Sequence, residues 1–126
     1  MTLVKKSMRH PNKNLTGIVS SITSKHIQRI TIGFVEQISD QQLQKVVMWG
    51  TWEKFDEAIA LLAERALNNG RRLELELHVC GNPTAGWFKQ IFPRFAENGC
   101  LVVVWTSFIW KGPILSHLSA QLEKAK

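Results

Sequence analysis

The alternation of apolar and polar residues predicts a strand near the middle of the chain. Across residues 71–79 every second side chain is apolar, and the side chains between them are polar or charged. This period of two is typical of a strand with one buried face and one polar face. The apolar members are Leu73, Leu75, Leu77 and Val79, and the polar members are Arg72, Glu74, Glu76 and His78.

Two further segments predict strands. In residues 26–35 the apolar side chains of Ile30, Ile32 and Phe34 alternate with other residues, including a β-branched threonine. Residues 100–105 are apolar almost throughout, which is typical of a strand covered on both faces.

Apolar residues at helical spacing predict two main helices. The clearer helix covers residues 51–67, carries one apolar stripe and ends before Gly70, which can take the left-handed conformation of a helix stop. A second helix covers residues 84–98, and Pro93 inside it should kink the helix or split it in two.

The remaining segments predict weaker elements. Residues 14–22 and 114–122 have the spacing of short amphipathic helices. For residues 36–50 we expect a loop that contains a short helix, with Ser39 or Asp40 as its cap.

The order of these elements predicts the fold class. Helices that alternate with strands indicate an α/β fold, here a small three-stranded parallel sheet with covering helices. The strands begin near residues 27, 71 and 100, and such spacings fall within the range of repeat architectures. We expect residues 1–13 to form a basic flexible N-terminal arm and residues 14–126 to form one α/β, repeat-like domain.

Several segments resemble one family. Residues 15–32 have the cadence of a leucine-rich repeat, and within them residues 24–32, Ser-Lys-His-Ile-Gln-Arg-Ile-Thr-Ile, resemble a phrase of the family. Trp52-Glu53-Lys54-Phe55-Asp56 is similar to the start of a family helix. Residues 62–77 are similar to the family's helix, turn and strand, and residues 92–103 to its last helix and strand. Over residues 15–105 the chain resembles the C-terminal portion of the fungal F-box and leucine-rich-repeat-like proteins.

This resemblance implies a leucine-rich-repeat-like fold that binds another protein. The family name also implies an adaptor role in ubiquitin ligases, which depends on an F-box. The sequence has no leucine-proline-x-glutamate-leucine stretch near its start, so we expect the F-box itself to be absent.

Positive charge is concentrated near the N-terminus. The net charge is +6, and the first 30 residues contain six basic residues and no acidic one. Such an arm can attract nucleic-acid phosphates or anionic lipid, so one alternative function is nucleic-acid or anionic-surface binding. The residues that would serve it are Lys5, Lys6, Arg9 and Lys13. A solvated tail is the competing interpretation, because the arm has no aromatic residue to stack on bases.

Composition and motifs exclude other classes. Apolar runs are much shorter than the ~18 residues of a membrane span, so we expect no membrane partner. Without a secretory signal we expect an intracellular protein, cytoplasmic or nuclear, with reduced thiols at Cys80 and Cys100. The chain has no Gly-rich phosphate loop and no paired CxxC motifs, so we expect no cofactor and no metal site.

One cysteine offers a possible nucleophile. Cys80 follows the strand of residues 71–79, and His78 lies two residues before it. A small cysteine-dependent enzyme is therefore a third hypothesis, but a buried thiol is the more common role of such a cysteine.

Exposed tryptophans point to a protein partner. Trp49 lies in the uncertain segment of residues 36–50, and Phe108 and Trp110 lie beyond the last predicted strand. Either site could form an apolar patch on the surface, although residues 108–110 could instead fold back over the end of the sheet. We expect a non-catalytic protein-interaction module. Its candidate partner-binding residues are Trp49, Phe108 and Trp110, with Arg72, Glu74, Glu76 and His78 on the polar strand face.

Overall fold

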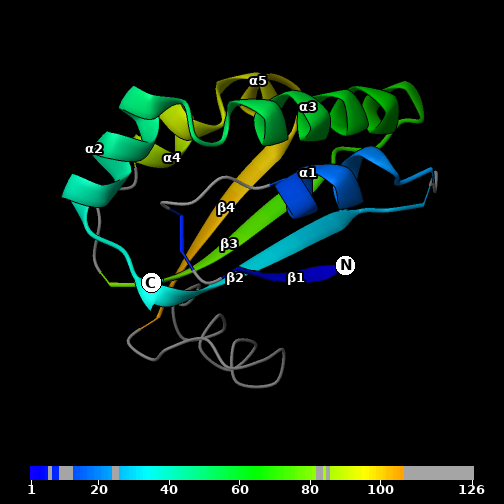
Figure 1. Ribbon diagram of the computed structural model, residues 1–126. Coiled ribbons are helices and arrows are strands. Elements are labelled where there is room, and N and C mark those ends of the chain that lie inside the picture. Colours follow the sequence, from blue (N-terminus) through cyan, green and yellow to red (C-terminus); the bar gives the residue numbers. More distant parts are fainter. Residues whose placement is uncertain (6, 9–12, 24–25, 82–83, 85, 107–126) are drawn as a thin grey trace.

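The chain forms two layers, a parallel sheet and a set of helices that covers one of its faces (Figure 1). A computed structural model describes residues 1–5, 7–8, 13–23, 26–81, 84 and 86–106. Among the described residues the peptide bonds are all trans, and only glycines have positive φ angles.

The sheet contains four strands in chain order, β1-β2-β3-β4, and each pair of neighbours is parallel. The strands are β1 (Thr2–Lys5), β2 (Arg29–Gln37), β3 (Glu74–Cys80) and β4 (Cys100–Thr106). The α/β class, the parallel pairing and the three predicted strands are confirmed. The count of three strands is corrected to four, because Thr2–Lys5 lies within the expected arm and pairs with β2 instead.

In the described part of the chain, five helices form the second layer. They are α1 (Lys13–Ser20), α2 (Asp40–Trp49), α3 (Glu53–Asn68), α4 (Gly86–Ile91) and α5 (Pro93–Asn98). Helix α2 contacts α4, and α3 contacts both α1 and α5. The predicted helix of residues 84–98 is split, since α5 begins at the proline that cannot continue α4. The segment of residues 114–122 lies outside the described residues.

Local sequence explains why α2 is a full helix of ten residues and not a single turn in a loop. The Ser39 hydroxyl accepts the N–H of Gln42, and the Gln42 side chain accepts the N–H of Ser39, which together make a capping box. At the other end Gly50 has a φ of 61° and closes the helix in the left-handed conformation. Helix α2 is therefore fixed at both ends.

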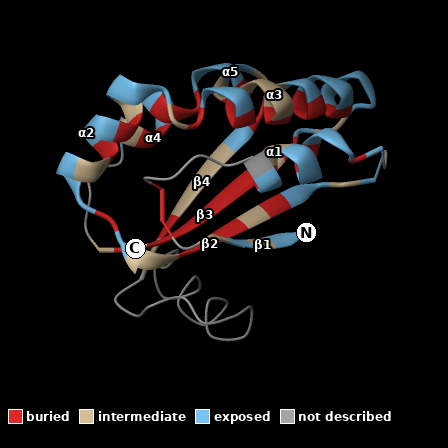
Figure 2. Cartoon of the chain, in the orientation of Figure 1, coloured by how far each residue is buried: buried red, intermediate tan, exposed pale blue. Residues whose placement is uncertain are grey.

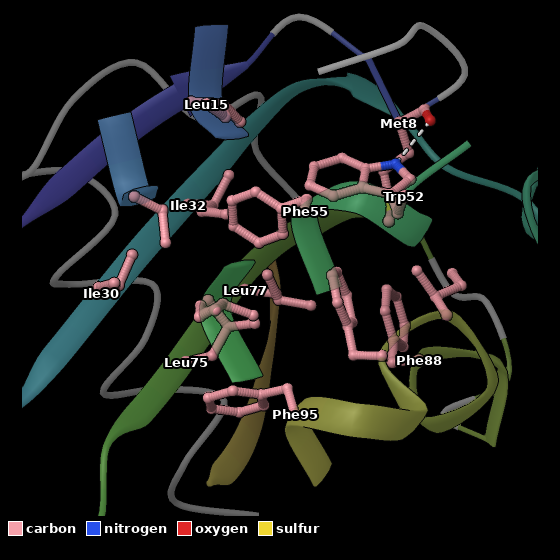
Figure 3. Close-up of a cluster of buried hydrophobic side chains, with 14 of the residues drawn as sticks. Met8, Leu15, Ile30, Ile32, Trp52, Phe55, Leu75, Leu77, Phe88 and Phe95 are labelled. Carbon is pink, nitrogen blue, oxygen red and sulfur yellow. Dashed lines mark hydrogen bonds between the residues drawn. The ribbon is translucent and has the colours of Figure 1, made fainter. Parts of the chain in front are cut away.

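The core lies between the helices and the sheet, and the outward sides of the helices are exposed (Figure 2). The sheet contributes the alternating apolar residues of β2 and β3, and α3, α4 and α5 contribute three phenylalanines (Figure 3). These buried side chains are Ile30, Ile32, Phe34, Leu75, Leu77, Val79, Phe55, Phe88 and Phe95. The alternation in the sequence thus identifies the face of the sheet that the helices cover.

Trp52 occupies the centre of an aromatic cluster in this core. Its ring makes edge-to-face contacts with the rings of Phe34, Phe55 and Phe92, with centroids 5.2–5.8 Å apart. Its indole Nε1–H donates to the carbonyl oxygen of Met8 at 2.9 Å (Figure 3). This bond connects the start of α3 to the segment that follows β1.

Candidate functional site

The polar residues of β3 form a chain of charged contacts with the first residue of β2. Arg29 Nε lies 3.3 Å from the Glu74 carboxylate and 3.6 Å from the Glu76 carboxylate. The parallel register brings these groups together, because Arg29 pairs with Glu74 and Thr31 pairs with Glu76. The polar residues Glu74 and Glu76, which alternate with the core residues of β3, are therefore ion-paired.

His78 extends this chain of contacts into a buried position. Its Nε2 lies 2.5 Å from Glu76 Oε1, which is a hydrogen-bond distance. Nδ1 is buried and has no hydrogen-bond partner within the described part of the chain. His78 is only 2% exposed and Glu76 only 5%. These two expected partner-binding residues are therefore not accessible to a ligand in this conformation.

The other two residues of the expected polar face remain at the surface. Glu74 is half-buried, and Arg72 is exposed. The Arg72 guanidinium donates to the carbonyl oxygen of Gly99 at 3.3 Å, which joins the chain before β3 to the residue before β4. Arg72 and Glu74 are therefore accessible to a ligand at the N-terminal end of β3.

The Cys80 and His78 pair lacks the contact that a nucleophile and its base need. Cys80 is buried at the end of β3, and the structure describes no hydrogen bond between its thiol and His78. Cys100 is exposed at the start of β4. Among the described residues, no group of three or more His, Cys, Asp or Glu side chains is placed to hold a metal ion.

Trp49 is an exposed aromatic residue at the C-terminal end of α2. Its exposed fraction is 67%, and that of the preceding Met48 is 72%. The two side chains follow the buried Val46 and precede the helix-closing Gly50. These two exposed apolar side chains, adjacent in sequence at the end of the helix, are here called the α2 tip.

A cavity of about 280 Å³ opens beside the α2 tip, between the ends of α2, α3, α4 and α5. Its walls combine apolar side chains with three charged ones. The lining residues are Val46, Val47, Gly50, Trp52, Glu53, Asp56, Gln90, Ile91, Pro93 and Arg94. The helical layer therefore has an exposed protrusion, the α2 tip, next to a recess, and a partner segment can contact both.

Asp56 is the charged residue of this cavity that is most deeply buried. Its carboxylate accepts the backbone N–H groups of Arg94 at 3.1 Å and Phe95 at 2.9 Å, in the first turn of α5. Burial raises the pKa of Asp56 above its usual value, and the two N–H donors oppose that rise. The residue is thus a cap for α5 supplied by α3, a role that its place in an acidic first turn does not reveal.

The basic residues of the expected arm are divided by the fold. Lys5 ends β1, where partial burial lowers its pKa, and Lys13 begins α1. Lys6 and Arg9 lie outside the described residues, as do Phe108 and Trp110. Of the four basic residues proposed for nucleic-acid binding, the described part of the chain thus includes Lys5 and Lys13, which belong to different elements.

Two broader observations complete the description of the site. Within the described ranges, the structure contains no helix that is both long enough and apolar enough to cross a membrane. In comparisons with protein-family models, with curated proteins and with solved structures, no match to the chain was found.

Proposed function

We propose that this chain is a non-catalytic protein-interaction module that contacts its partner through the α2 tip. The observation that carries the proposal is the 67% exposure of Trp49 beside the similarly exposed Met48. Tryptophan and methionine are enriched at protein interfaces, and tryptophan is among the residues that most often dominate their binding energy.

The construction of α2 supports this role. The capping box at Ser39 and the left-handed Gly50 fix both ends of the helix, so Trp49 is held on a rigid element. A preorganised anchor loses less conformational entropy on binding than one on a loop. The neighbouring cavity offers the partner a recess of about 280 Å³ next to this anchor.

We propose further that the domain is built like the terminal repeats of a leucine-rich-repeat-like F-box protein. Strands in chain order, parallel pairing and helices on one face of the sheet support this architecture (Figure 1). Free thiols at Cys80 and Cys100 fit the reducing, intracellular setting that such a protein would have.

A differential capture experiment tests the interaction. The full chain is immobilised beside two double variants, Met48→Ala with Trp49→Ala, and Leu61→Ala with Leu67→Ala. Leu61 and Leu67 are also exposed apolar residues, but they lie on α3, away from the α2 tip. We expect a protein that is retained by the parent chain and the α3 variant and lost with the α2 variant.

The captured protein is then purified and titrated against all three chains. The proposal requires the α2 variant to weaken the dissociation constant by about tenfold or more, as expected for a hot-spot tryptophan. Capture that both variants lose equally, or that neither variant loses, would contradict it.

A further inference from the structure

We propose that an arginine-lined depression at the N-terminal ends of β2 and β3 binds a carboxylate-rich peptide segment. The depression has a volume of about 560 Å³ and is open to solvent. Its lining residues are Gln28, Arg29, Arg71, Arg72 and Glu74, and they are here called the arginine depression. Helix α2 follows the opposite end of β2, so this site goes beyond the function proposed for the α2 tip.

The charges in the depression favour an anion. Among its described lining residues are three guanidinium groups and one carboxylate, that of Glu74. Arg29 is ion-paired with Glu74 and, at 3.6 Å, with the buried Glu76, and Arg72 donates to the neutral carbonyl of Gly99. Positive charge is therefore in excess within the depression, and the net charge of +6 adds a field that attracts acidic partners.

The backbone beneath these arginines is held in place by hydrogen bonds. The N–H of Glu74 donates to the Gln28 carbonyl, and the N–H of Arg71 donates to the Ala66 carbonyl at the end of α3, both at 2.9 Å. One Arg71 nitrogen also lies 3.4 Å from Nδ1 of His26. The arginine side chains thus project from two ordered strand ends, which lowers the cost of arranging them around a ligand.

The lining chemistry favours a carboxylate over a nucleic acid. Guanidinium groups bind carboxylates in a planar, two-bond geometry, and the cationic residues among the described lining of the depression are all arginines. The described lining residues include no aromatic side chain, whereas proteins that bind single strands use aromatic rings to stack the bases. A segment rich in Asp and Glu is therefore the occupant that fits both the charge and the surface.

Fluorescence anisotropy with a short, labelled glutamate-rich peptide tests the proposal. A peptide of the same length with glutamine in place of glutamate is the neutral control. We expect the glutamate peptide to bind the full chain and the glutamine peptide not to bind. Replacing Arg71 and Arg72 together by glutamine should weaken binding by about tenfold or more, since a lost charge-assisted hydrogen bond is worth about that factor.

A control variant separates the site from net charge. Lys54→Gln with Arg65→Gln also removes two positive charges, from exposed positions on α3 outside the depression. This variant should bind the glutamate peptide within about threefold of the parent, because exposed charges at a distance are screened. Equal weakening by both double variants would overturn the proposal.

An added-charge variant and two alternative ligands test the charge and the identity of the occupant. Gln28→Glu adds a carboxylate to the depression without removing an arginine, and it should weaken binding of the glutamate peptide. Single-stranded RNA and inorganic phosphate are titrated in parallel, and tighter binding of either than of the peptide would overturn the choice of occupant. Trp49→Ala should leave peptide binding unchanged, so this proposal and the one for the α2 tip can fail separately.

Discussion

Trp52 shows how one side chain can connect segments that are distant in sequence. Its ring packs against phenylalanines from β2, α3 and the residue before α5, and its Nε1–H reaches the backbone of Met8. The sequence places Trp52 on an apolar stripe, so its burial is predictable. The identity of its hydrogen-bond partner is not, because that contact joins residues separated by 44 positions.

Asp56 is a second residue whose role depends on tertiary structure. In sequence it is one of several acidic residues in the early turns of a helix, where acidic side chains are common. In the structure it is buried and caps α5 through the N–H groups of Arg94 and Phe95. Nothing in the local pattern around Asp56 could identify a partner helix that begins more than thirty residues later.

The raised pKa of Asp56 predicts a pH-dependent effect of Asp56→Asn. Burial raises the pKa in the folded state above the ordinary 3.8, so the protonated form is favoured by folding. That contribution is fully present below the ordinary value and is lost as pH rises through the raised pKa. Asparagine stays neutral at every pH. We expect Asp56→Asn to lower the free energy of unfolding by about 1–3 kcal/mol at pH 4, because one N–H is then poorly satisfied. The loss should be smaller at pH 7.

Urea unfolding of the parent and the variant between pH 4 and pH 7 measures this trend. Glu64→Gln, on the exposed side of α3, serves as the control for removal of an acidic group without a buried contact. A cost of Asp56→Asn that increases with pH would show that the two N–H donors outweigh burial in setting the carboxyl pKa.

At the level of elements, a helix or strand could be predicted from the sequence when its own residues show the pattern that stabilises it. Periodicity identified β2, β3 and α3, since their apolar faces are long enough to show a period, and an almost unbroken apolar run identified β4. Thr2–Lys5 is too short for that and is a strand because it pairs with Thr31–Phe34. The start of α2 was visible in Ser39, but its end at Gly50 was not predicted, and its three glutamines concealed the extent of the helix.

The capping box of α2 leads to a prediction at this scale. Ser39→Ala removes the hydroxyl that accepts the Gln42 N–H, so we expect the free energy of unfolding to fall by about 1 kcal/mol. Thermal unfolding followed by circular dichroism measures the change. Gln41→Ala, an exposed substitution in the same turn, should have no such cost, and equal destabilisation by both substitutions would argue against the capping role.

At the scale of the whole molecule, the two layers were predictable and the candidate surfaces only in part. The alternating pattern of β3 indicated which residues turn away from the helices, and those side chains do form one row. It could not show that Glu76 and His78 are buried, since burial and their contacts with each other and with Arg29 depend on tertiary structure. Nor could it reveal that Arg29 and Arg72 line one depression, because strand register brings them together.

The different burial of the two cysteines predicts how the folded molecule reacts with a thiol reagent. Cys100 is exposed, and Cys80 is buried at the end of a central strand. We expect one thiol to react rapidly under native conditions and the second to react only when the chain unfolds. A colorimetric disulfide reagent measures both phases, and Cys100→Ser should abolish the rapid phase. Rapid reaction of both thiols in the parent chain would contradict the burial of Cys80.

The chain order of the strands also has a consequence for folding kinetics. Each parallel pair requires the chain to travel back across the helical layer, and the longest return is between β2 and β3, where Arg29 pairs with Glu74. The entropy lost in closing a loop increases with its length, and non-local pairings slow folding. We therefore expect the joining of β2 to β3 to be the late, rate-limiting event, with β1–β2 and β3–β4 assembling first as separate halves.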